Sequence, residues 1–142
     1  MTNEEKYRKY MRCLNRWMSN RENGKWVADY LFANQIHWIG IYGYGMLGKH
    51  LVHELQTKSF PIKWVMDRSS LGDENYHDIQ KPDNLCKLGD VDMVIITSLA
   101  DVENVEAFLL QSVTGNIISI EELVDSILVW RNQIRNCVNE RH

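Results

Sequence analysis

The chain has 142 residues, of which 44% are hydrophobic and 25% are charged, and its formal net charge is −3. This profile predicts a single globular domain, and the mildly acidic balance argues against a surface devoted to nucleic acid. A dinucleotide-dependent dehydrogenase needs a nucleotide-binding unit and a separate substrate region. The length leaves room for little more than the first of these.

The apolar segments predict a cytoplasmic protein without a transmembrane helix. Runs such as Met93–Ile96 are far shorter than the roughly 20 residues that span a bilayer. The charged segment Asn3–Lys9 is not followed by the apolar core of a signal peptide. The three cysteines, Cys13, Cys86 and Cys137, form no Cys-x-x-Cys pair and are typical of reduced, buried thiols.

Residues 1–35 read as an N-terminal helical extension. Thr2 and Glu5 form a capping box for a first helix that is expected to run to about Ser19, and a second short helix is expected over Trp26–Asn34. This extension carries 7 Lys and Arg against 4 Asp and Glu, whereas residues 36–142 carry 9 against 15. The extension is therefore expected to contact something different from the rest of the chain.

Residues 36–142 alternate between strand and helix patterns. Four apolar runs predict strands, a helix follows the first, Asp101 is expected to cap another, and a capping box at Ser119 and Glu122 opens a C-terminal helix reaching Ile134. The polar stretch 68–80 reads as a loop. The predicted strands are His37–Tyr42, Pro61–Asp67, Val91–Thr97 and Asn116–Ile120. Such alternation predicts an α/β fold with a parallel sheet of four to five strands, helices on both faces and two helices before it.

A glycine-rich turn follows the strand His37–Tyr42 and opens the next helix. Its pattern is Gly43-x-Gly45-x-x-Gly48, and Asp67 lies 19 residues further on, at the end of the next strand. This combination matches the fingerprint of dinucleotide-binding, Rossmann-like domains. In that pattern Gly43 permits a tight turn, Gly45 lets a pyrophosphate approach the backbone, and Gly48 allows the helix to pack closely on the strand.

The cofactor contacts follow from that pattern. Tyr44, Met46 and Leu47 belong to the same turn and first helical turn, where backbone amides receive an anion. Asp67 would accept hydrogen bonds from a ribose diol, which favours NAD(H) over NADP(H), while Arg68 would stack on adenine or meet a 2′-phosphate. The alternative is that the glycines only shape a turn and that Asp67 only ends a strand.

Two further patterns bear on the chemistry. The same turn reads as a phosphate-binding P-loop, but His50 stands where such a loop needs Ser or Thr for magnesium. Thr97 and Ser98 end the strand expected beside the turn, where their hydroxyls face a ribose or a sugar unless Ser98 only caps a helix. His50 and His53 are three residues apart and are better explained as solvated side chains than as metal ligands.

Residues typical of catalysis are less evident. No tyrosine is followed by lysine four residues later, as in short-chain reductases, and there is no Gly-x-Ser-x-Gly nucleophile turn. The sequence therefore favours a binding module over catalysis by this chain alone. An oxidoreductase or sugar-nucleotide-modifying subunit completed by a partner chain stays open. So does a ligand-free interaction protein in which the first helix, with Met11 and Leu14, pairs with another chain, for example as a homodimer.

Five segments carry a resemblance to a known family. They are Gly24–Leu31, Ile39–Gly48, Val65–Arg68, Val91–Ser98 and Ile117–Leu123. Together they resemble the small Rossmann-like module found alone or attached to glycosyltransferases and sugar-modifying enzymes of bacterial surface-polysaccharide clusters. They are more distantly similar to the nucleotide-sugar-binding domain of sugar acyltransferases and to redox-sensing repressor domains.

The resemblance implies a ligand and a role. The ligand would be NAD(H) or a nucleotide sugar bound at the glycine turn and Asp67, and the partner would be an enzyme of polysaccharide biosynthesis. The chain departs from this family in the segment Ser69–Gln80, where such domains usually place a short third strand.

Overall fold

Helices and parallel strands alternate in this chain after two consecutive helices. The computed structural model describes residues 1–83 and 88–130. The helices are α1 (Asn3–Glu22), α2 (Val27–Ala33), α3 (Met46–Thr57), α4 (Val102–Leu109) and α5 (Ile120–Val129), and a short 3-10 helix, η2 (Leu99–Asp101), precedes α4. The strands are β1 (Ile39–Tyr42), β2 (Ile62–Met66), β3 (Ile79–Gln80), β4 (Met93–Ile96) and β5 (Asn116–Ser119).

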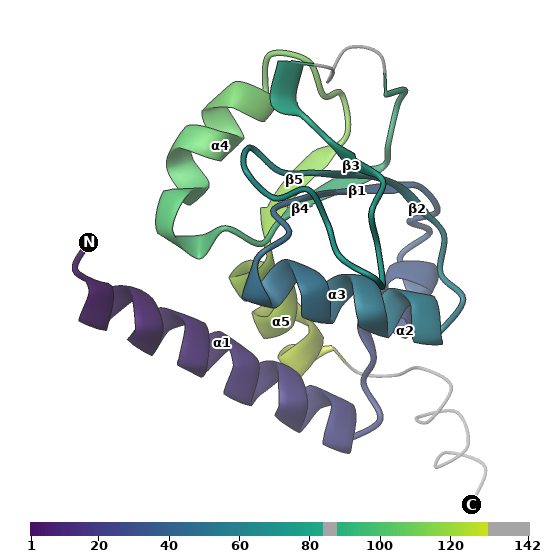
Figure 1. Cartoon of the computed structure of the whole chain (residues 1–142). Coiled ribbons are helices and arrows are strands. Elements are labelled where there is room, and N and C mark those ends of the chain that lie inside the picture. Colours follow the sequence, from purple (N-terminus) through teal and green to yellow (C-terminus); the bar gives the residue numbers. More distant parts are fainter. Residues whose placement is uncertain (84–87, 131–142) are drawn as a thin grey trace, which may run out of the picture.

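One parallel sheet forms the centre of the molecule (Figure 1). Its strand order is β3-β2-β1-β4-β5, and in the central strand Ile41 lies opposite Val65 of β2 and Ile95 of β4. Parallel neighbours require crossover connections, which place helices on the faces of the sheet. The structure thus confirms the predicted α/β fold, with a Rossmann-like parallel sheet and two helices before the first strand.

Both faces of the sheet are covered. Ile41 and Ile95 point toward the layer of α1, α2, α3 and α5, while their neighbours Tyr42 and Ile96 point toward the side of α4. Figure 1 shows these two layers below and above the sheet. Burial on both faces explains why β1 and β4 are continuous apolar runs instead of alternating apolar and polar residues.

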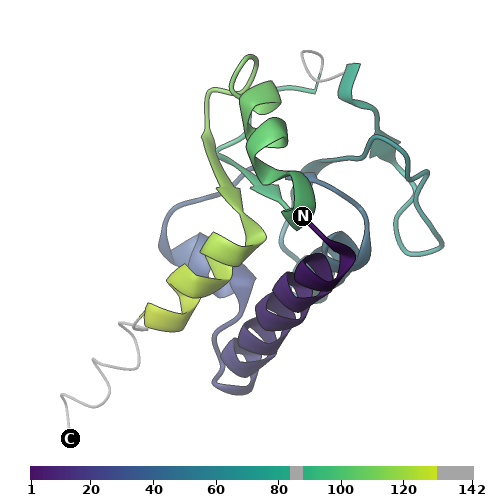
Figure 2. The same ribbon diagram turned by 90° about the vertical axis from the view of Figure 1, so that its left-hand side faces the viewer.

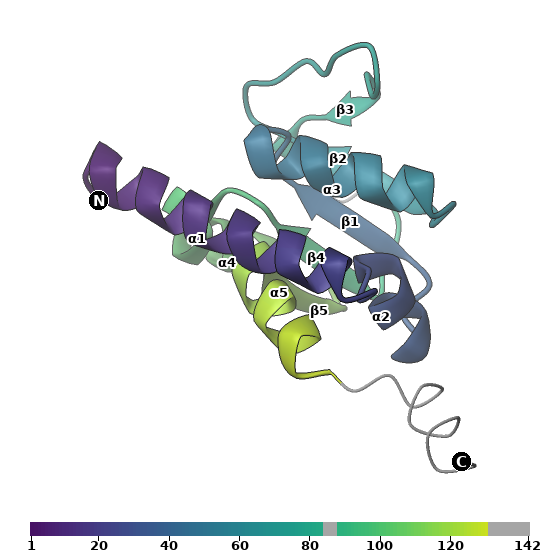
Figure 3. The ribbon, with the colours of Figure 1, turned by 90° about the horizontal axis from the view of Figure 1, so that it is seen from below.

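The first two helices pack into the hydrophobic core on the face of the sheet that α3 and α5 cover. Cys13 and Trp17 of α1 and Val27 and Leu31 of α2 are buried in the same cluster as side chains of α3, α5 and the strands. Seen from below, α1 lies in front of the sheet, between α3 and α5 (Figure 3). No helix in the described part of the chain has the length and apolar content needed to cross a bilayer.

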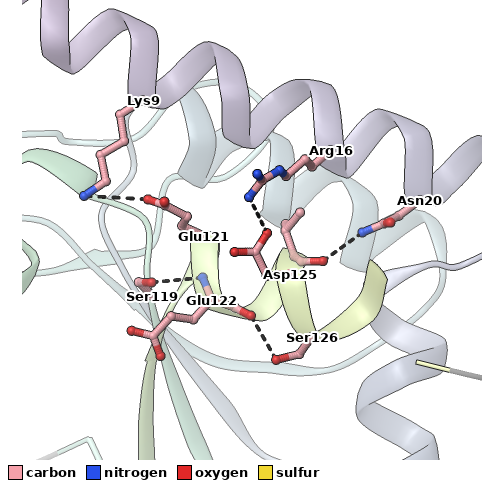
Figure 4. Close-up of polar contacts among 9 residues, drawn as sticks. Lys9, Arg16, Asn20, Ser119, Glu121, Glu122, Asp125 and Ser126 are labelled. Atoms are coloured by element: carbon pink, nitrogen blue, oxygen red, sulfur yellow. Dashed lines mark hydrogen bonds and ion pairs between the residues drawn. The ribbon is translucent and has the colours of Figure 1, made fainter. Parts of the chain in front are cut away.

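Polar contacts fasten α1 to α5 (Figure 4). Arg16 Nη1 lies 2.7 Å from Asp125 Oδ1, and Lys9 Nζ lies 3.6 Å from a carboxylate oxygen of Glu121. Further along, Asn20 Nδ2 donates to the carbonyl of α5 residue Val124 at 3.0 Å. Asn20 is 2% exposed, so this hydrogen bond satisfies a buried donor that would otherwise be costly.

Glu54 of α3 is a carboxylate buried beneath α1 and α2. Its Oε1 accepts a hydrogen bond from Trp17 Nε1 at 2.9 Å and lies 3.5 Å from Arg21 Nε, both on α1. Its Oε2 accepts from the backbone N–H of Val27 at 3.1 Å, at the start of α2, where the N-cap residue Trp26 provides no side-chain bond. Glu54 therefore caps α2 from a different helix. Burial raises the pKa of Glu54 above its ordinary value, although these contacts oppose that effect.

The structure corrects two expectations about local elements. Ile79 and Gln80, expected within a loop, form the short strand β3, which pairs with the end of β2. Asp101 precedes α4 but does not cap its backbone, because its carboxylate instead accepts from the side chain of Asn104 at 2.7 Å. Both differences depend on contacts that spacing alone does not reveal.

The helix ends agree more closely with the sequence. The capping box of Thr2 and Glu5 is present, and the Ser119 hydroxyl accepts from the backbone N–H of Glu122 at 3.1 Å. α1 continues to Glu22, past the expected end at Ser19, and Figure 2 shows it as one uninterrupted helix. The expected end of the last helix at Ile134 lies outside the described residues.

Glu54→Gln is expected to lower the free energy of unfolding by about 1–3 kcal/mol, because each carboxyl oxygen accepts from a buried N–H, of Trp17 or of Val27, whereas an amide has a single acceptor oxygen. The raised pKa of Glu54 means that the folded state binds the carboxyl proton more tightly than the unfolded state does. The stability that this proton binding gives the wild type is complete below about pH 4.3, the ordinary glutamate pKa, and is lost as the pH rises above it. The difference in unfolding free energy between the wild type and Glu54→Gln, measured with urea, should therefore become smaller as the pH increases. The exposed Glu106→Gln is the control, and a deficit that widens with pH would contradict the assignment.

Candidate functional site

The glycine turn lies at the carboxyl-terminal edge of the sheet, between β1 and α3. β1 is the central strand: the chain crosses from it to β2 on one side, and it returns from β3 to β4 on the other. This reversal of direction marks the place where open α/β sheets bind their ligands. The topology therefore brings the turn, the end of β2 and the end of β4 together.

The three glycines differ in what a side chain would meet. Gly43 has φ of +111°, and a Cβ there would clash with Thr97 Oγ1 and lie 2.7 Å from Ser98 Oγ. A Cβ at Gly48 would clash with the Gly43 carbonyl, which shows how closely α3 packs on the turn. At Gly45, by contrast, no atom lies within 4 Å of the Cβ position. Gly43 and Gly48 are thus required by the turn itself, as expected, whereas the Cβ position of Gly45 is open.

The amino-terminal end of α3 is open toward solvent. Gly45 is the N-cap residue and contributes no side-chain bond to the first helical turn. Gly45 and Met46 are exposed, whereas Leu47 is 1% exposed and anchors this turn in the core. Because the first N–H groups of a helix carry partial positive charge, an anion can approach this end without displacing a side chain.

Asp67 supports the turn from the end of β2. Its Oδ2 accepts from the backbone N–H of Tyr44 at 2.7 Å, and its Oδ1 accepts from those of Ser69 and Ser70 at 2.8 and 2.7 Å. Desolvation raises the pKa of Asp67, but the three N–H donors outweigh it and hold the pKa below its ordinary value. A carboxylate has about four acceptor positions, so one remains for a ligand hydroxyl.

A polar cluster beside the turn was not anticipated from the sequence. Tyr44 is buried, and its hydroxyl donates to Asp73 Oδ1 at 2.7 Å, while Asp73 Oδ2 lies 3.8 Å from Lys49 Nζ. The backbone N–H groups of Asn75 and Tyr76 also donate to Asp73 Oδ1. These bonds dock the segment after β2 against the turn. The Tyr44 hydroxyl, followed by the two amides, lowers the pKa of Asp73, which keeps its carboxylate ionised.

The remaining predicted residues divide into two groups. Thr97 is 3% exposed, and its Oγ1 lies 2.8 Å from the Gly43 carbonyl, so its hydroxyl is committed to holding the turn instead of facing a ligand. Ser98 is half-buried beside Gly43, and Arg68 is exposed at the end of β2. Ser98 and Arg68 thus remain accessible at this edge, as does the exposed Met46 at the start of α3.

The other candidate residues are the two histidines of α3 and the cysteines, and none of them is part of a metal site or other functional cluster in the described residues. His50 and His53 are both exposed on α3, and no set of three or more His, Cys, Asp and Glu side chains in the described residues has the arrangement of a metal site. Cys13 is buried, and burial raises the pKa of its thiol to about 12. Cys86 and Cys137 lie outside the described residues.

A hollow of about 570 Å³ lies at the opposite edge of the sheet, by the amino-terminal ends of β1, β4 and β5. Its lining includes Trp38, Asp90, Asp92, Gly115 and Asn116. Asp92 is structural, because its Oδ2 accepts from the backbone N–H groups before β1 at 2.9 Å. The hollow is therefore separate from the site that the sequence predicts.

Gly48→Ala and Gly45→Ala form a matched pair that tests the roles of the glycines. The first is expected to lower the free energy of unfolding by about 2–3 kcal/mol, because its methyl group meets backbone atoms of Gly43 that cannot move aside. The second is expected to change that energy by no more than about 0.5 kcal/mol, because its methyl group enters open space. Chemical denaturation measures both. Equal effects would contradict the geometry.

Comparison with known proteins adds no further assignment. No protein-family model, curated protein or solved structure matches the chain. The function is therefore inferred from the residues of the glycine turn and their surroundings.

Proposed function

We propose that the chain is a nucleotide-binding module whose ligand is NAD(H) or a nucleotide sugar. The observation that carries this proposal is the open end of α3 at Gly45. It lies between two glycines whose side-chain positions are blocked, Gly43 by Thr97 and Ser98 and Gly48 by the Gly43 carbonyl. A pyrophosphate diester is common to both ligands. It would accept hydrogen bonds from the uncapped amides of α3, as in other glycine-rich turns.

The surroundings of the turn suit the rest of such a ligand. Asp67 keeps one acceptor position, enough for one ribose hydroxyl, since the other positions are used by backbone donors. Arg68 is exposed next to it and offers a planar cation for a base. Lys49 Nζ adds positive charge on the same side of α3, although Asp73 lies 3.8 Å away.

The role proposed for the module is in the assembly of bacterial surface polysaccharides. This role rests on the resemblance of the glycine turn and the strand segments to modules of that context. The module would hold the nucleotide, and an enzyme on another chain would supply the substrate region and the catalytic acid or base.

A thermal-shift panel with NADH, NADPH, ADP and UDP- and GDP-sugars tests the proposal. A ligand at 100 times its dissociation constant is expected to stabilise the folded protein by about 2.7 kcal/mol. Gly45→Val should abolish that shift, because its side chain occupies the space for the pyrophosphate, while the unliganded variant melts like the wild type.

Ala33→Val is the control, since it adds similar bulk at an exposed position on α2. It should keep the full shift. A panel without any shift would overturn the proposal, and a shift that survives Gly45→Val would place the ligand elsewhere.

A further inference from the structure

α1 exposes a line of large apolar side chains that the core does not use. Tyr7, Met11 and Met18 are 66%, 59% and 52% exposed, although their neighbours Cys13 and Trp17 are buried on another face of the same helix. In Figure 3 the outer side of α1 faces the viewer, and no other helix or strand within residues 1–83 and 88–130 covers it. Exposed apolar side chains gathered on one helix face are typical of an interaction surface.

The line belongs to a longer repeat, which we term the outer stripe. Its members are spaced alternately by three and four residues, which is the pattern of a helix that packs against another helix. They are Glu4, Tyr7, Met11, Leu14, Met18 and Arg21. The four central members are apolar, and of these Leu14 is half-buried and also packs against the core. The first member is an acid and the last is a base.

We propose that the outer stripe binds the outer stripe of a second copy of this chain, with the two α1 helices antiparallel. In one antiparallel register Tyr7 faces Met18 of the second copy, and Met11 faces Leu14 of the second copy. The same register places Glu4 opposite Arg21 at both ends. The stripe is thus complementary to itself under a two-fold axis, as an isologous interface requires.

The charged residues at the two ends of the stripe favour the antiparallel orientation. Parallel helices would place Glu4 beside Glu4 and Arg21 beside Arg21, whereas the antiparallel pair brings opposite charges together and also opposes the helix dipoles. The side chain of Glu4 is 81% exposed; its Oε1 lies 2.9 Å from Arg8 Nη2 on the same helix, and its second carboxylate oxygen is accessible to a second chain. Arg21 is 35% exposed, lies 3.5 Å from Glu54 through its Nε and is stacked 4.4 Å from the centre of the Trp26 ring, and the other N–H donors of its guanidinium would meet the Glu4 of the second copy.

The size of the stripe sets the strength of the dimer. A helix of 20 residues is about 30 Å long. One such helix pair falls short of the roughly 800 Å² that a standard interface buries on each partner. The dimer is therefore in reversible exchange with the monomer, and the outer stripe shares no residue with the glycine turn. The inference is independent of the proposed nucleotide.

Sedimentation velocity of the full chain over a range of concentrations tests the dimer. The wild type should show a concentration-dependent shift from monomer to dimer, and Met11→Glu should raise the dissociation constant about 100-fold, because symmetry buries the new charge twice. Leu110→Glu is the matched control at another exposed apolar side chain and should dimerise like the wild type. A wild type that stays monomeric up to its solubility limit, or a Met11→Glu variant that dimerises normally, would overturn the proposal.

Disulfide cross-linking tests the orientation without weakening the stripe. Tyr7→Cys and Met18→Cys chains carrying tags of different size should cross-link when mixed. Neither should cross-link with itself, because residue 7 and its copy lie about 16 Å apart along the helix axes in this register. Wild-type chain under the same conditions gives the background from the native cysteines. Self-linking of either variant without the mixed product would indicate parallel helices and overturn the antiparallel pairing.

A lipid surface is the competing occupant of an apolar helix face. Flotation with vesicles of phosphatidylcholine and phosphatidylserine distinguishes it, since a dimer that buries the stripe should remain unbound. A monomeric chain that floats with these vesicles and loses this binding in Met11→Glu would assign the stripe to the membrane and overturn the second-copy proposal.

Discussion

Glu54 places a carboxylate among the buried side chains of three helices, and the arrangement of those helices depends on how that charge is satisfied. Transfer of a carboxylate from water to a protein interior is costly unless donors surround it. The hydrogen-bond donors are Trp17 on α1 and the first amide of α2, and Arg21 on α1 forms an ion pair with the carboxylate. The two helices before the sheet are thus fixed by a side chain of α3, more than 25 residues further along the chain.

α3 is held in place near both of its ends. Around Glu54 the helix is held by α1 and α2, while at its start Gly48 packs against the backbone of the glycine turn. α3 is therefore fixed in position before any ligand arrives, and its uncapped end at Gly45 points out of a rigid frame. The backbone of the turn is thus pre-organised, and the proposed nucleotide would bind there with little ordering of the backbone.

The two strands beside β1 brace the turn from opposite sides. Thr97, after β4, holds the Gly43 carbonyl, and Asp67, after β2, holds the amide of Tyr44. These two polar residues thus act mainly on the backbone, and the proposed nucleotide would meet the amides of α3, the exposed Arg68, the half-buried Ser98 and the remaining acceptor position of Asp67. Meanwhile, the fixing of α1 over α3 and α5 leaves its outer stripe directed away from the core.

The sequence by itself determined what depends on near neighbours. The capping box at Thr2, the apolar runs of β1 and β4 and the three glycine positions all follow from interactions within a few residues, which spacing and residue type record directly. Only the tertiary structure decided which donors reach Glu54, how Asp73 meets Tyr44, that β3 adds to the sheet edge and which face of α1 is left outside. These features join segments distant in the chain, and their partners are set by packing of the whole core, which local periodicity does not encode.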